Sequence, residues 1–293
     1  MRRWLMFVVL ALLPSILLAA PAAVVEGLQM PAWLERDGAR SALRPGMELK
    51  GSDQLHTGAG ARVLLSLEEG SHVKLGENAD LQLGTLQPPA DAQGIYKGVL
   101  EVLKGAFRFT TSALGKHRQR DITARIATIT IGIRGTDVWG KAQPDRDFAV
   151  LLEGKITIQR EGEPEQTMSA PMSLFMAPRG QPALPIGPVN PDDLKRWAQE
   201  TELQKGQGIL LAGGHYALRV AQYRYAASAE AIVRQLTEAG YTSAAQPRRR
   251  GGADWREVVM PGFATRPDAE HVAGQLKEAF HFTHIEIIEN TPQ

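Results

Sequence analysis

The chain of 293 residues contains no cysteine, and this absence excludes disulfide bonds, thiolate metal sites and a cysteine nucleophile. It also lacks an excess of either charge, with 33 Lys and Arg against 32 Asp and Glu, so no broad positive field favours nucleic acid as a partner. Beyond the N-terminus it has no apolar run long enough to cross a membrane. Packing of apolar side chains must therefore hold the fold together.

The first residues have the order of a secretory signal. Two arginines precede the apolar run from Trp4 to Leu18, and small residues follow, with Ala20 and Ala22 spaced for cleavage. We predict a signal peptide over residues 1–22 and a periplasmic mature chain that meets the membrane only transiently. An uncleaved signal is the alternative, although Pro14 and the short apolar run argue against a permanent anchor.

Short apolar runs separated by glycine turns fill the region over residues 39–177. Turn signals stand at Glu69-Gly70, Lys104-Gly105 and Glu153-Gly154. The runs are of strand length and several alternate with polar residues, so the region is predicted to be all-β, with a roll or a β-solenoid as its shape. The predicted strands are Val63 to Leu67, Val73 to Leu75, Leu81 to Leu83, Phe107 to Phe109, Ile122 to Ile126, Ile129 to Ile133, Val150 to Leu152 and Ile156 to Ile158.

This region resembles the FecR domain. The resemblance rests most of all on IGIRGTD from Ile131 to Asp137, and further on the strings Pro45 to Gly58, Arg62 to Leu75, Gly76 to Asn78, Lys104 to Phe107 and Leu151 to Ile158. It implies an exported β-rich module that serves in recognition or assembly. Members of the family that act as anti-sigma regulators carry a cytoplasmic region and a membrane helix before the domain. Only a signal peptide is predicted here, so the regulator role is not implied.

Arg134 and Asp137 in that string invite two interpretations, a ligand or catalytic role and a structural one. We favour the structural role, in which Gly132 and Gly135 form a bend and Arg134 pairs with Asp137 or caps a carbonyl. No catalytic triad or pair of carboxylates stands at a recognisable spacing. The pair His281 and His284 lacks a third ligand nearby. We therefore predict no enzyme activity, no metal site and no cofactor.

A proline-rich stretch marks a boundary, and we assign residues 178–212 to a Pro/Gly-rich linker with a short helix. The helix is predicted to start at Asn190, because an N-cap residue, a proline and two carboxylates follow one another there.

The C-terminal part contains an internal sequence repeat. Ala229 to Ala239 (AEAIVRQLTEA) recurs as Ala269 to Ala279 (AEHVAGQLKEA), 40 residues later. Each copy is an amphipathic helix between strand-like runs, which indicates a duplicated unit of order β-α-β-β-α-β. We predict a four-stranded antiparallel sheet with two helices on one face, over residues 213–290. A ligand would lie on the open face.

This part resembles a SPOR domain. The resemblance is carried by the string from Tyr216 to Tyr241 and by its second half from Trp255 to Phe280. It implies binding to peptidoglycan, with a preference for glycan strands stripped of stem peptides, at division sites. Two positions depart from the family's pattern: Arg219 stands where glutamine is frequent, and the second half carries Pro261-Gly262-Phe263.

The candidate glycan-binding residues come from the first and third strands of that sheet. An aromatic ring can cover a sugar face, and a guanidinium can bind a carboxylate through two hydrogen bonds. Each candidate has an alternative role, since the aromatics can close the core and Arg219 can be a solvated strand charge. Arg248 to Arg250 are interpreted as a flexible loop. The glycan-binding set is Arg219, Ala221, Tyr223, Trp255, Arg256 and Val258.

The sequence thus predicts a multi-domain protein, all-β and then α+β, of the cell envelope. Its expected partner is peptidoglycan, and a further envelope protein is the expected partner of the FecR-like module. The alternative is a periplasmic signalling component whose FecR-like module senses a partner and whose SPOR-like module only locates it.

Overall fold

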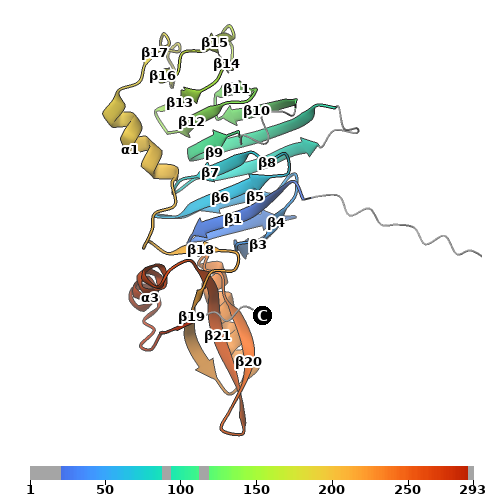
Figure 1. Ribbon diagram of the computed structural model, residues 1–293, viewed down its shortest axis with the longest axis vertical. Coiled ribbons are helices and arrows are strands. Elements are labelled where there is room, and N and C mark those ends of the chain that lie inside the picture. Colours follow the sequence, from blue (N-terminus) through green and yellow to red (C-terminus); the bar gives the residue numbers. More distant parts are fainter. Residues whose placement is uncertain (1–20, 88–93, 112–118, 290–293) are drawn as a thin grey trace, which may run out of the picture.

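The computed structural model describes residues 21–87, 94–111 and 119–289, so nearly all of the predicted signal peptide lies outside the described part. Strands dominate the N-terminal portion, and a smaller portion with two helices follows it (Figure 1). The predicted succession of an all-β region and an α+β domain is confirmed. Among the described residues, no helix is long and apolar enough to cross a membrane.

Two sheets make up the N-terminal portion, here called the β module. The first sheet contains β1 (Ala23–Gln29), β4 (Glu48–Leu49), β6 (Arg62–Leu67), β7 (His72–Leu75), β12 (Asp137–Ala142), β13 (Arg146–Glu153), β16 (Ser173–Pro178) and β17 (Gly187–Pro188). The second contains β2 (Ala32–Arg36), β3 (Ala39–Ala42), β5 (Gln54–Thr57), β8 (Asp80–Gln87), β10 (Arg120–Ile126), β11 (Ile129–Ile133), β14 (Ile156–Arg160) and β15 (Gln166–Met168). All pairings within the two sheets are antiparallel except the parallel pair of β9 (Tyr96–Thr110) with β10.

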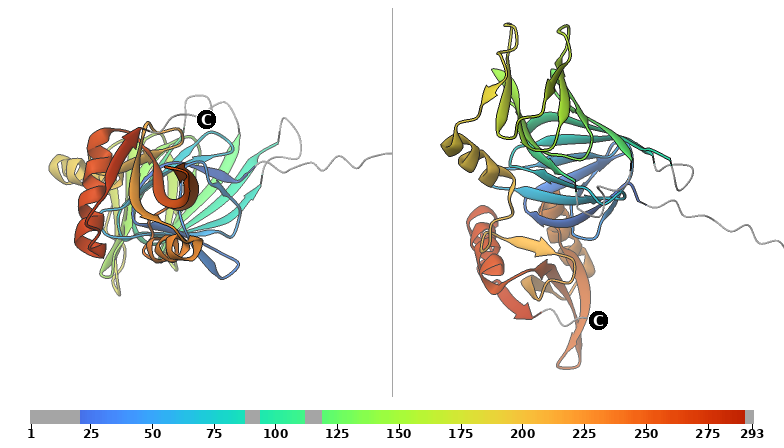
Figure 2. Two further views of the ribbon diagram at one scale, coloured as in Figure 1. Left: turned by 90° about the horizontal axis from the view of Figure 1, so that it is seen from below. Right: turned by 45° about the horizontal axis from the view of Figure 1, so that its top comes forward.

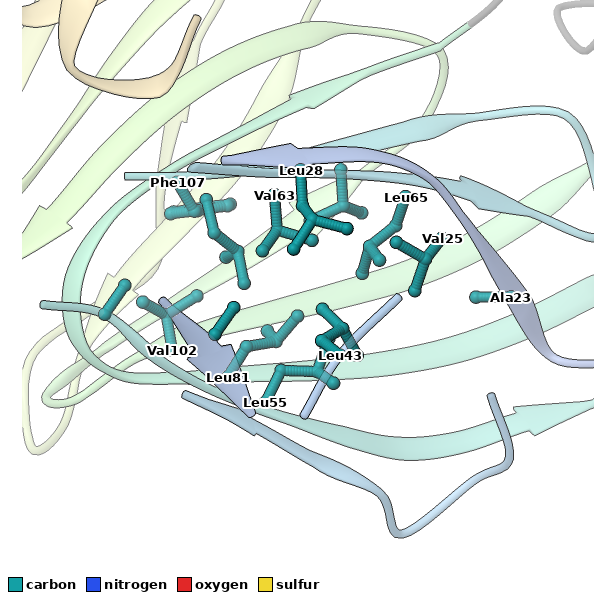
Figure 3. Close-up of a cluster of buried hydrophobic side chains, with 14 of the residues drawn as sticks. Ala23, Val25, Leu28, Leu43, Leu55, Val63, Leu65, Leu81, Val102 and Phe107 are labelled. Carbon is teal, nitrogen blue, oxygen red and sulfur yellow. The ribbon is translucent and has the colours of Figure 1, made fainter. Parts of the chain in front are cut away.

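The core lies between the two sheets. Val63 and Leu65 of the first sheet face Leu55 and Leu81 of the second, and all four are almost fully buried (Figure 3). Alternation along each strand produces this arrangement, because every second side chain points inward. The apolar runs that predicted the strands are thus the runs that form the core.

Strand β9 belongs to both sheets. Its first half pairs with β8 and β10 in the second sheet, and its second half pairs with β7 and β12 in the first. Lys104-Gly105 lies inside this strand, where Gly105 has a φ of +84° and where a Cβ would come within 2.6 Å of Ala79. The prediction of a turn between two strands is wrong here: the glycine bends one strand from sheet to sheet.

The β module begins earlier and ends later than residues 39–177. Strand β1 pairs along most of its length with β6, and β2 pairs with β3 and β5. At the other end, β17 pairs with β16. The segment from Ala23 to Ala42, for which the sequence predicts no strand, is therefore part of the sheets.

The predicted linker packs on the β module. Helix α1 (Pro191–Thr201) begins with Asn190 as its N-cap, as predicted, and lies against the outer face of the first sheet (Figure 1). Trp197 of the helix contacts Trp139 and Phe148, which belong to that face. Further ion pairs join Lys74 to Glu202, Arg108 to Glu202 and Lys141 to Glu200.

The short strand β18 (Ile209–Leu211) connects the two portions of the protein. It pairs with β1 of the β module, and Leu210 pairs in turn with Phe263 of the C-terminal domain. A second contact lies at the end of helix α2 (Ala226–Glu238): the Ala32 amide donates to the Gly240 carbonyl, and the Trp33 indole donates to the Glu238 carbonyl. The first sheet therefore continues into the C-terminal domain, as the views in Figures 1 and 2 show.

The C-terminal domain has the strand order β20-β21-β19-β22, all antiparallel. Its further elements are β19 (Tyr216–Tyr223), β20 (Ala244–Arg250), β21 (Ala253–Phe263), α3 (Arg266–Phe280) and β22 (Glu286–Glu289). Thr265 caps α3, since its side chain accepts a hydrogen bond from the Asp268 amide. Helix α2 begins after Tyr225, which makes no side-chain capping hydrogen bond. Arg248, Arg249 and Arg250 lie in β20 and not in a loop, since the turn falls on Gly251 and Gly252.

Candidate functional site: the open face of the C-terminal sheet

The two helices cover one face of the C-terminal sheet. Val258 and Met260 of β21 are fully buried, in the same hydrophobic cluster as Leu236 of α2 and Leu276 of α3. Side chains that alternate with Val258 and Met260 along β21, among them Glu257, belong to the opposite face. Directly opposed residues of an antiparallel strand pair lie on the same face of the sheet. The register therefore shows on which face each side chain of the neighbouring strands lies. The helix-free side is called the open face below.

A β-bulge in β19 decides which candidates reach the open face. Arg219 pairs with Val259, whereas Ala221 pairs with Val258, so the register shifts between them. A bulge adds one residue and reverses the alternation beyond it. Arg219 and Ala221 therefore lie on opposite faces, and Ala221 packs against the core. Strict alternation along this strand predicts Arg219, Ala221 and Tyr223 on one face, and the bulge makes that prediction wrong.

Arg219 is held in an ion-pair network on the open face. Its guanidinium contacts Glu286 of β22 at 2.5 Å and Glu257 of β21 at 3.2 Å. Glu257 is almost fully buried, and it also accepts a hydrogen bond from Gln222 at 3.0 Å and contacts Arg248 at 3.2 Å. The arginine is therefore a member of a cross-strand network and not a free surface charge.

Trp255 and a group of arginines lie toward the β20–β21 hairpin. The Arg224 guanidinium lies 4.3 Å from the centre of the Trp255 ring, a cation–π contact. Arg248 is opposite Trp255 in the register. Within the described residues, neither Arg249 nor Arg256 forms an ion pair. The hairpin end thus offers an aromatic ring with several arginines around it, and Asp254 lies among them.

Five of the six predicted residues line two separate hollows, although Tyr223 and Arg256, opposite one another in the register, belong to the same face of the sheet as Ala221 and Val258. One of about 460 Å³ follows β19 and is lined by Arg219, Ala221 and Tyr223, with Arg250 and His284 among its other walls. The other, of about 300 Å³, lies at the hairpin and is lined by Trp255 and Arg256.

The sixth predicted residue is misplaced. Val258 has no exposed surface and lies in the core under the helices, so it presents no atom to a ligand. Val258 pairs with Ala221, and both therefore lie on the helix-covered face of the sheet.

Four residues of the open face were not in the predicted set: Gln222, Arg224, Arg248 and Glu257. Arg224 follows the first strand directly, at a position opposite Trp255 if the antiparallel register is continued, so it could have been found once the strand pairing was known. Glu257 carries no such signal, because its partners come from the two neighbouring strands, β19 and β20.

The β module contains a second departure from expectation. Asp137 does not pair with Arg134; it accepts two hydrogen bonds from Arg108 of β9, at 2.9 and 2.7 Å. The hydrogen bonds with Asp137 raise the pKa of Arg108 above its ordinary value, against the opposing effect of burial. The predicted bend is present, with Gly135 at a φ of +76°, but Arg134 is exposed.

Comparison with known proteins identifies both portions. Residues 53–157 match the model of the family described as FecR protein, and residues 212–286 match that of the SPOR domain. The chain therefore combines a FecR domain with a SPOR domain, as the sequence motifs predicted. Both families consist of non-catalytic binding or regulatory domains.

Among solved structures, two crystal structures of a provisionally assigned anti-sigma factor from Parabacteroides distasonis ATCC 8503 are similar to this chain. They are 13% and 11% identical to it, with TM-scores of 0.39 and 0.41. Each alignment covers 81% of this chain and 99% of the other. At these scores the likeness carries no argument about fold or function. Among curated proteins, none matches the sequence.

Proposed function

We propose that this is an exported, non-enzymatic protein of the cell envelope that binds peptidoglycan through its SPOR domain. The signal-like N-terminus supports export to the periplasm, and the family of the C-terminal domain supports the ligand. Glycan strands without stem peptides are the preferred form, and the division septum, where such strands occur, is the location that follows. The FecR domain acts as a recognition or assembly module for another envelope protein.

The observation that carries the proposal is the cluster around Trp255. Its ring lies 4.3 Å from the Arg224 guanidinium, and it lines the hollow at the hairpin together with Arg248, Arg249, Asp254 and Arg256. A sugar ring presents an apolar face to an aromatic side chain, and the carboxylate of muramic acid matches a guanidinium. Arg219 is already paired with two glutamates, so it contributes by shaping the groove along β19.

Co-sedimentation of the full chain with purified sacculi tests the proposal, before and after an amidase removes the stem peptides. We expect more protein to sediment with the stripped material. Trp255→Ala should weaken binding about tenfold, equivalent to a contact of about 1.4 kcal/mol. Arg234→Ala is the control, because this exposed arginine lies on α2, on the helical side of the domain.

Binding of the Trp255→Ala protein at the level of the unchanged chain would exclude the hairpin cluster as the site. Absence of binding to either form of sacculus would contradict the proposal as a whole. That outcome would favour the signalling alternative, in which the FecR domain senses a partner protein.

A further inference from the structure

The outer face of the second sheet carries a regular polar surface. The register places Thr123 of β10 opposite Gly132 of β11, Gly132 opposite Thr157 of β14, and Thr157 opposite Thr167 of β15. The intervening residues of these strands, such as Ile131, Ile156 and Ile158, point into the core and are buried. One row of side chains, here called the threonine row, thus crosses four neighbouring strands.

Gly132 makes this row concave. A trough of about 650 Å³ lies over it, and Thr123, Thr130, Thr157 and Thr167 all line the trough. A Cβ at position 132 would come within 2.6 Å of the Thr157 hydroxyl oxygen, so any side chain there would press against that threonine. Hydroxyl groups that both donate and accept hydrogen bonds therefore surround an open floor.

Two positive charges stand together at one end of the trough. Ile133 pairs with Ile156, so the next residues, Arg134 and Lys155, lie opposite one another. Both are exposed and both line the trough. Within residues 21–87, 94–111 and 119–289, neither forms an ion pair, and the carboxylate of Asp137 is held by Arg108. Like charges in direct opposition repel one another, and an anion placed between them relieves the repulsion.

The remaining walls suit a polyol. Asp121 lines the trough at its charged end, opposite Arg134 if the β10–β11 register is continued, and Gln159 and Glu165 line the other end. Carboxylates and amides accept hydrogen bonds from neighbouring hydroxyls of a sugar, and the threonines complete the set. The trough contains no aromatic side chain among its lining residues, so hydrogen bonds and charge provide the recognition.

We propose that this trough of the FecR domain is a second glycan site, which binds a sugar chain bearing carboxylate groups. Arg134 and Lys155 hold a carboxylate, and the threonine row binds the hydroxyls of the adjoining sugars. The site gives a role to the arginine of the string IGIRGTD, which is left unpaired in the structure. It lies in the other domain from Trp255 and so does not depend on the proposed SPOR site.

Isothermal titration of the full chain with tetragalacturonate, a carboxylated tetrasaccharide, tests the site. Galactotetraose is the neutral control sugar, and inorganic phosphate is the control anion. We expect tetragalacturonate to bind at least tenfold more tightly than either control. Binding should weaken as salt rises from 50 to 300 mM, since the contact is charged and exposed.

Variants separate the trough from other positive surfaces. The double variant Arg134→Gln, Lys155→Gln should bind tetragalacturonate at least tenfold more weakly. Both side chains are exposed, so the substitutions should leave the fold unchanged. Lys104→Gln is the matched control, since this exposed lysine of β9 lies outside the trough. Trp255→Ala should leave this affinity unchanged.

Three results would overturn the inference. They are no binding of tetragalacturonate at millimolar concentration, equal affinity for phosphate or for the neutral sugar, and full affinity in the double variant. A loss of affinity in Trp255→Ala alone would move the binding to the SPOR domain and would also overturn it.

Discussion

Trp197 of α1 stacks on Trp139 of β12, with ring centroids 5.6 Å apart and ring planes 7° from parallel. Trp139 is fully buried beneath the helix, although it lies on the outer face of its sheet. Trp197, which covers it, belongs to residues 178–212, the segment whose composition predicts a linker. The outer face of the first sheet is therefore completed by a helix.

Removal of this stacked ring should release α1. We expect Trp197→Ala to lower the free energy of unfolding by about 2 kcal/mol, less than a fully buried tryptophan would cost, because Trp197 is only half-buried. Urea denaturation measures the loss, and limited proteolysis should cut the variant between residues 178 and 208. Lys195→Ala, an exposed change on the same helix, serves as control. Equal protease resistance of the two variants would contradict the assigned role of the ring.

The joint between the domains can be tested at Gly240. A side chain there would come within 2.6 Å of the Trp33 ring, and the residue has a φ of +82°. We expect Gly240→Ala to separate the domains, which would appear as two thermal transitions and a larger radius of gyration. Gly213→Ala has the same backbone cost at a φ of +76° but meets no atom within 4 Å. The difference between the two variants therefore measures the contact with Trp33, and identical behaviour would show that this contact does not hold the joint.

The buried carboxylate of Asp268 fastens α3 to β18. It accepts hydrogen bonds from the Gly208 and Ile209 amides at 3.1 and 3.0 Å, and it is fully buried. Asp268→Ala should destabilise the protein by about 2 to 4 kcal/mol, because two buried amides lose a charged acceptor. Chemical denaturation gives the value. Asp192→Ala, at an exposed position in the first turn of α1, should cost less than about 1 kcal/mol. Similar losses for the two would show that burial of the carboxylate adds nothing.

The partners of Asp137 give a direct test of the two arginines. Arg108→Ala should destabilise the β module by about 1 to 3 kcal/mol, since it removes both hydrogen bonds to Asp137 and the contact with Glu202. Arg134→Ala should change the stability by less than about 0.5 kcal/mol, because the side chain is exposed. Thermal denaturation of the two variants shows which arginine stabilises the β module. A larger loss of stability in Arg134→Ala than in Arg108→Ala would support the pairing of Arg134 with Asp137 that the sequence favours.

These cases show what the sequence can predict. The strands of the β module and both helices of the SPOR domain follow from local patterns, because alternation and helical periodicity are properties of neighbouring residues. The residues from Ala23 to Gln29 gave no such signal, since they follow directly on a run of small residues that reads as a cleavage region. Only the pairing of β1 with β4, β6 and β18 identifies them as a strand.

Partners distant in the chain were the main source of error. Asp137 was assigned to the arginine three residues away, whereas its partner Arg108 lies on the neighbouring strand. The face of Ala221 was derived from strict alternation, and a bulge that no local pattern announces reversed it. Trp197 could be recognised as part of a helix but not as the cover of Trp139. Tertiary pairing decides all three, and the composition of a segment does not encode it.

Strand β18 has a mechanical consequence. It pairs on one side with β1 through three residues and on the other side with β21 through Leu210. A tension that draws the two domains apart is transmitted through this strand and shared among the few backbone hydrogen bonds on its two sides. The pairing with β21 is a single residue pair, so on that side much of the load falls on the hydrogen bonds that Asp268 accepts from the Gly208 and Ile209 amides, and loss of these bonds would let the C-terminal domain separate first.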